Sequence, residues 1–85
     1  MYKIILHKRP ANFYTRLDKK QRERIGKAID KLKENHLQGR NIKRLKGELE
    51  GKYRLRVGPF RIVYIVDKSK NLIVIESIGS RGSVY

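Results

Sequence analysis

The chain has 85 residues, enough for one domain with a modest hydrophobic core. It has no cysteine and no apolar run near the roughly 20 residues of a membrane-spanning helix, which excludes a disulfide scaffold and predicts a cytoplasmic protein. Its 22 Lys and Arg against 8 Asp and Glu give a formal net charge of +14. Such a charge favours a nucleic acid as partner, although an acidic protein, an anionic membrane surface or no such partner remain alternatives.

The first predicted elements are a short strand and a short helix. Residues 2–7 are mostly apolar and predict the strand. Pro10 suits the first position of a helix, because its missing N–H group would have no acceptor there. Phe13 and Leu17 lie four residues apart, so a helix over 10–17 would carry both on one side.

A longer amphipathic helix follows, with Asp18 as its N-cap and its end near Asn35. Gly26 either weakens its middle by about 1 kcal/mol relative to alanine or allows a neighbour to pack closely. The apolar side of this helix recurs at spacings of three and four residues and consists of Ile25, Ala28, Ile29, Leu32 and His36.

The second half of the chain is predicted to be mostly strand. Residues 37–51 are a connection that holds a short turn of helix or strand around 42–45. Three strands follow, over 52–57, 60–66 and 72–78. The sequence therefore predicts one α+β domain over residues 1–85, in strand-helix-helix-three-strand order. Its sheet should be mainly antiparallel, with the two helices packed on one face.

The first two of these three strands form a hairpin with two unlike faces. Gly58-Pro59 suits a two-residue turn of type II′, because glycine tolerates the positive φ at its first position. This register aligns six apolar side chains toward the core: Tyr53, Leu55, Val57, Phe60, Ile62 and Tyr64.

Cations occupy the other face of the same hairpin. Arg56 lies opposite Arg61, and Lys52 and Arg54 share their side, so like charges destabilise this pairing by roughly 0.2–1 kcal/mol. An anion bound between them would turn the repulsion into attraction, and planar guanidinium groups bind phosphate in bidentate fashion. The alternative is a solvated strand face whose charges protect an edge from aggregation.

Other chemistry finds little support in the sequence. The two histidines, His7 and His36, make no metal-ligand pattern, and no nucleophile triad or phosphate-binding glycine loop is present. Arg81 and Tyr85 follow the last predicted strand. Tyr85 is either a frayed terminal residue or a phenol that stacks on a base or handles a proton.

The stretches "RLKGELEGKYRLRVGPFRIVYIV" and "VIESIGSRGSVY" resemble the RelE/ParE superfamily of bacterial and archaeal toxins, and the resemblance extends over nearly the whole chain. The tail is more similar to the RelE branch, whose members enter the ribosomal A site and cut mRNA. ParE relatives inhibit gyrase and generally lack the catalytic cations and the tyrosine. The resemblance thus implies a toxin that inhibits translation as an endoribonuclease, with a gyrase inhibitor or a non-catalytic nucleic-acid-binding module as alternatives.

The resemblance implies a reaction that uses neither a metal nor a cofactor. The 2′-OH of RNA attacks the adjacent phosphorus and leaves a 2′,3′-cyclic phosphate. Tyr85 would accept the proton or position the hydroxyl, while Lys52 and Arg54 would lower the pKa of that phenol and hold phosphate. Arg61 would stabilise the phosphorane, and Arg81 would lie near the leaving oxygen. Phosphate binding would involve Lys52, Arg54, Arg56, Arg61 and Arg81.

Two departures from the RelE pattern bear on the proton acceptor. Arg54 stands where the family has a lysine, so it keeps the charge without a transferable proton. The α-carboxylate beside Tyr85 would raise the pKa of its phenol, which makes Glu76 the alternative base, although its face of the sheet cannot be assigned from the sequence. The implied partners are the ribosome, mRNA and a RelB-like antitoxin, usually acidic, that wraps and neutralises the toxin.

Overall fold

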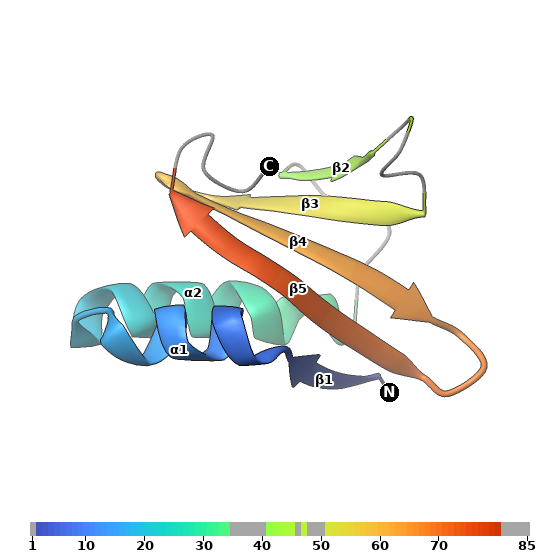
Figure 1. Ribbon diagram of the computed structural model, residues 1–85, viewed down its shortest axis with the longest axis horizontal. Helices are drawn as coiled ribbons and strands as arrows, with labels where there is room; N and C mark the ends of the chain where they lie inside the picture. The colour runs from blue at the N-terminus through green and yellow to red at the C-terminus, as the bar shows by residue number, and fades with distance from the viewer. Residues whose placement is uncertain (1, 35–40, 46, 48–50, 81–85) are drawn as a thin grey trace.

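The computed structural model describes residues 2–34, 41–45, 47 and 51–80, and these form one sheet with two helices on one of its faces (Figure 1). In chain order the elements are β1 (Lys3–Leu6), α1 (Lys8–Arg16), α2 (Lys19–Leu32), β2 (Ile42–Arg44), β3 (Lys52–Val57), β4 (Phe60–Asp67) and β5 (Leu72–Ser80). The strand order is β1-β5-β4-β3-β2, with β1 parallel to β5 and every other pair antiparallel. This arrangement confirms the predicted α+β class and the mainly antiparallel sheet.

The main addition to the predicted order is the edge strand β2. The sequence left helix or strand open around residues 42–45, and the structure shows a three-residue strand paired antiparallel with β3. Ile42 lies opposite Leu55 and packs against the core, which fixes the register of this strand. Four strands therefore follow the helices instead of three.

The starts of the helices follow the ordinary rules for unpaired N–H groups. Helix α1 begins at Lys8, two residues before the predicted start at Pro10. Pro10 lies in the first turn and is fully buried; its missing N–H costs nothing there, because the first four N–H groups of a helix lack intrahelical acceptors. The Asp18 N-cap of α2 is confirmed, since its Oδ1 accepts a hydrogen bond of 2.9 Å from the Gln21 N–H.

Helix α2 ends at Leu32, and the predicted end near Asn35, together with His36, lies outside the described residues. Gly26 lies where the two helices touch. A Cβ atom at this position would meet the Tyr14 hydroxyl at 3.0 Å, and that hydroxyl donates to the Arg22 carbonyl at 3.2 Å. This contact supports the second of the two alternatives, in which Gly26 allows a neighbour to pack closely.

The core lies between the helices and one face of the sheet. Ile25, Ile29 and Leu32 of α2 are buried against strand residues from β3, β4 and β5. The rings of Phe13 on α1 and Phe60 on β4 meet edge to face, with centroids 6.1 Å apart. The two predicted helices thus cover one face of the sheet, as expected, and leave the other without a helix (Figure 1).

The hairpin has the predicted register. Val57 lies opposite Phe60, Arg54 opposite Val63 and Arg56 opposite Arg61. Gly58 has φ +58°, as a type II′ turn requires at its first position. A Cβ at Gly58 would also lie 2.8 Å from Cζ of Arg24, so the guanidinium of α2 rests against the turn.

A β-bulge interrupts the pairing of β4 with β5. Val63 lies opposite Ser77, yet the next residue, Tyr64, lies opposite Ile75, which leaves Glu76 as the extra residue. The alternation of β5 side chains between the two faces of the sheet is therefore shifted by one residue at Glu76. Among the described residues, no helix is both long and apolar enough to cross a bilayer.

Candidate nucleic-acid interface

The face of the sheet without helices, here called the open face, carries most of the predicted site residues. Residues that alternate with the buried ones on β3 and β4 must point to this side. On β2 the same alternation places Lys43 here, because Ile42 packs into the core. The open face is formed by Lys43, Lys52, Arg54, Arg56, Arg61, Val63, Ile65, Asp67, Val74, Glu76 and Ser77.

The cations on this face are neighbours across the strands. Arg56 and Arg61 are directly opposite each other, and Arg54 is flanked by Lys43 on one side and Val63 on the other. Adjacent strands lie about 4.8 Å apart, so β3 and β5 are separated by roughly 10 Å. Arginine and lysine side chains are long enough to meet over the strand between them.

One ion pair crosses the open face. Nζ of Lys52 on β3 lies 2.7 Å from Oε1 of Glu76 on β5, so the pair spans the intervening strand β4. The two side chains are 33% and 24% exposed, respectively, and Oε1 itself is buried. The bulge places Glu76 on this face, and the ion pair holds it there. A partly exposed carboxylate thus stands beside the Lys52 ammonium on the open face.

The structure brings four of the predicted site residues to one face: Lys52, Arg54, Arg56 and Arg61. Arg54 and Arg61 are half-buried, and Arg56 is exposed. The remaining two, Arg81 and Tyr85, lie outside the described residues. Lys43 was missed by sequence reasoning, because its segment looked like a connection.

The tyrosines of the covered face have a structural role. Tyr53 and Tyr64 stack with centroids 5.5 Å apart, directly opposite each other on β3 and β4. Burial, reinforced by the neighbouring Tyr53, raises the pKa of Tyr64 far above the ordinary value of a phenol. Tyr64 is therefore a neutral phenol at physiological pH and does not serve as a proton acceptor.

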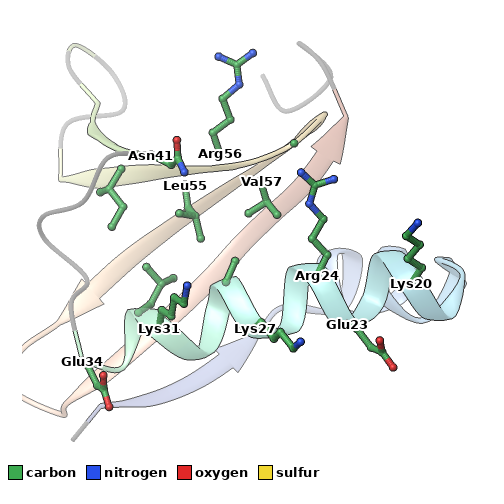
Figure 2. A pocket seen from close by; sticks show the side chains of 14 residues that line it. Lys20, Glu23, Arg24, Lys27, Lys31, Glu34, Asn41, Leu55, Arg56 and Val57 are labelled. Atoms are coloured by element: carbon green, nitrogen blue, oxygen red, sulfur yellow. The ribbon is translucent and has the colours of Figure 1, made fainter.

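A groove of about 850 Å³ lies between α2 and the strands β2 and β3, and it is called here the α2 groove. Its apolar lining comes from Ala28, Leu32, Ile42, Leu55 and Val57, and its cations from Lys20, Arg24, Lys27 and Lys31. Figure 2 shows Arg24 reaching from α2 toward β3, while Arg56 projects from β3 away from α2. The groove and the open face thus meet along β3.

The fold and the cationic open face define a small basic α+β domain, and comparison with known proteins gives the family. The family model described as ParE toxin of type II toxin–antitoxin systems, parDE, matches residues 4–85. The chain therefore belongs to the RelE/ParE superfamily of toxins of type II toxin–antitoxin systems.

Relatives and solved structures agree with this assignment. A Methanocaldococcus jannaschii protein assigned as toxin RelE1 is 33% identical over 86 residues, which cover 99% of this chain and 94% of that protein. A chain of the archaeal RelE–RelB complex from Pyrococcus horikoshii OT3 has a TM-score of 0.82 and 25% identity, covering 98% of both chains. A chain of the intact E. coli RelBE toxin–antitoxin complex has a TM-score of 0.79 and 19% identity, covering 95% of this chain and 98% of its own.

Proposed function

We propose that this protein is a RelE-like toxin that cleaves mRNA in the ribosomal A site and thereby inhibits translation. The observation that carries the proposal is the convergence of Lys52, Arg54, Arg56 and Arg61 on one face of the sheet. No described helix covers this face, so a polyanion can approach it (Figure 1). Such a row of like charges is unfavourable in the free protein and becomes favourable around a phosphodiester.

The cations would act by stabilising charge during attack of the 2′-OH on the adjacent phosphorus. Arg56 and Arg61, directly opposed, offer guanidinium donors for the equatorial oxygens of the phosphorane. Arg54, one row along the sheet, would bind a neighbouring phosphate and fix the position of the strand. The products would be a 2′,3′-cyclic phosphate and a 5′-hydroxyl. These roles, and those of Arg81 and Tyr85, are part of the proposal.

Mapping of mRNA 5′ ends after induction tests this function. The wild type should produce new 5′ ends within translated regions, in phase with codons, and Arg61→Ala should abolish them. Arg16→Ala is a matched control, because it removes an exposed arginine from α1, away from the open face. Ends that arise equally in untranslated RNA, or that persist in Arg61→Ala, would count against a ribosome-dependent ribonuclease.

Inhibition of gyrase is the second candidate, because the matching family model is that of ParE toxins. A ParE-like toxin would induce DNA damage signalling and inhibit supercoiling without producing new mRNA ends. The same induction experiment separates the two functions when the supercoiling of a reporter plasmid is measured alongside the mRNA ends.

The α2 groove is the proposed binding site for the antitoxin. An amphipathic acidic segment would place apolar side chains on Leu32, Leu55 and Val57 and carboxylates beside Lys27 and Lys31. Structures similar to this chain were solved as RelE–RelB and RelBE complexes, which supports a partner of this kind.

Charge reversal tests the antitoxin proposal. The double variant Lys27→Glu with Lys31→Glu should weaken binding of the cognate antitoxin at least about tenfold, as expected when like charges face each other. Toxicity should remain, because the open face is unchanged. Lys68→Glu, in the exposed turn between β4 and β5, is the control. Equal antitoxin binding by both variants would place the antitoxin elsewhere.

A further inference from the structure

We propose that Glu76 is the general base that accepts the 2′-OH proton in the RNA cleavage reaction. The inference rests on the proposed ribonuclease function and names the proton acceptor within it. It assigns to the middle of β5 a step that the family resemblance would give to Tyr85. The observation behind it is the location of a partly exposed carboxylate amid the cations of the open face, held by Lys52 at 2.7 Å.

The bulge explains how a carboxylate comes to lie on this face. It inserts Glu76 between Ile75, which faces the core, and Ser77, which pairs with Val63. Arg54 on β3, Val63 on β4 and Ser77 on β5 lie side by side in one row across the sheet. The Glu76 side chain therefore lies on the open face next to this row, and β4 separates it from Arg54. Bulges are common next to active sites, where they redirect a side chain.

The ion pair gives the carboxylate a fixed position. Lys52 reaches across β4 to Oε1, which is buried, while 24% of the Glu76 side chain stays exposed. One oxygen is thus tied to the sheet, and part of the side chain can still approach a ligand. This combination of restraint and access is what a general base requires.

A carboxylate is better suited to this step than a phenol at neutral pH. Glutamate side chains are ordinarily ionised at pH 7, whereas a tyrosine with a pKa near 10 keeps its proton. In the proposed step the 2′-OH proton passes to Glu76 as the 2′-oxygen bonds to phosphorus. The bond between phosphorus and the 5′-oxygen breaks, and that oxygen gains a proton from water. Glu76 then returns its proton to water, so that atoms and charge balance.

The second carboxylate on this side of β4 provides a useful contrast. Alternation along β4 places Asp67 on the open face, at the end of the strand. Its Oδ1 accepts hydrogen bonds from the Ser69 hydroxyl at 2.7 Å and the Lys70 N–H at 3.2 Å. Both donors belong to the turn that follows β4, so this oxygen has its hydrogen-bond partners within the turn. Asp67→Asn therefore makes the same charge change as Glu76→Gln without removing the ion pair with Lys52.

Single-turnover cleavage of mRNA on programmed ribosomes tests the assignment. Glu76→Gln should lower the rate constant of cleavage by about 100- to 10,000-fold, the range of a lost general base. Binding should stay the same or tighten, because Lys52 is released to bind phosphate. Asp67→Asn should cleave at the wild-type rate. A Glu76→Gln variant that cleaves like wild type would make Glu76 a counterion and overturn the proposal.

The pH dependence of the wild type is a second test that needs no variant. A general base must be deprotonated to act, so the cleavage rate should fall when the solution is made acidic, and a rate that does not fall in acid contradicts a carboxylate base. Loss of cleavage in Tyr85→Phe, together with its retention in Glu76→Gln, would assign the base to Tyr85. Failure of the wild type to cleave any ribosome-bound mRNA overturns the proposed function itself, and the base with it.

Discussion

The two faces of the hairpin formed by β3 and β4 differ in charge and in their cover by helices, although their residues alternate along the same two strands. The covered face buries Leu55, Phe60 and Ile62 beneath the helices, while the open face presents Arg54, Arg56 and Arg61. The covered face supplies stability, and the open face carries a charge that opposes folding and favours a polyanionic ligand. One hairpin can therefore both stabilise the fold and attract an anionic ligand. Single substitutions on one face should change one of these properties without the other.

The largest expected effect is on the covered face. Ile62→Ala should lower the free energy of unfolding by about 2–5 kcal/mol, because it opens a cavity at a fully buried position. Ile65→Ala, on the open face of the same strand and half-buried, is the matched control. Urea denaturation measures both. Equal losses would mean that the open face contributes as much to the core as the covered one.

The turn that aligns the two faces should be the next most sensitive feature. Gly58→Ala should cost about 1–2 kcal/mol for the left-handed backbone, and it should also displace the Arg24 guanidinium, which lies 2.8 Å from the added methyl group. Gly47→Ala is the comparison, since Gly47 has φ +72° and open space around it. Thermal unfolding should rank Gly58→Ala as more destabilising, and the reverse ranking would refute the role of Arg24.

On the open face, removal of a charge should have the opposite sign. Arg56→Ala should raise the free energy of unfolding by about 0.2–1 kcal/mol, because it relieves the repulsion from Arg61 directly opposite. The gain should shrink at high salt, where exposed charges are screened. The same variant should bind RNA more weakly. A loss of stability would show that Arg56 makes favourable contacts in the folded protein. It would contradict the statement that the charge of the open face opposes folding.

The smallest expected effect concerns the acid at the end of β4. The Ser69 hydroxyl, with a smaller contribution from Lys70, lowers the pKa of Asp67 below its ordinary value. A lowered pKa stabilises the folded state above the pKa of the unfolded chain, and this contribution is lost as the pH falls through the folded value. In an NMR titration, Ser69→Ala should raise the pKa of Asp67. An unchanged pKa would refute this cause.

The sequence predicted the hairpin best, because alternation and the Gly-Pro turn constrain its register together. It could not decide the state of Ile42–Arg44, since a three-residue strand with one core side chain has too little pattern of its own. The pairing of β1 with β5 depends on the path of the chain around two helices, so no local pattern encodes it.

Glu76 shows why part of the site stayed beyond prediction. Counted forward from Ile75, which faces the core, Glu76 should point outward. Counted backward from Ile78, also in the core, it should point inward. Only the bulge resolves this conflict, and a bulge is set by tertiary pairing with β4. Lys43 escaped notice for a similar reason, since only its pairing with Arg54 brings it to the open face.

We propose that the cations of the open face stabilise a phosphodiester of RNA while it is cut. The most direct test is the rate at which Arg61→Ala forms 2′,3′-cyclic phosphate ends on ribosome-bound mRNA. This rate should be about 100- to 1,000-fold below that of the wild type, as for loss of one donor to a developing oxyanion, and the variant should still fold. A rate equal to that of wild type, or a loss no greater than in Arg16→Ala, would contradict it.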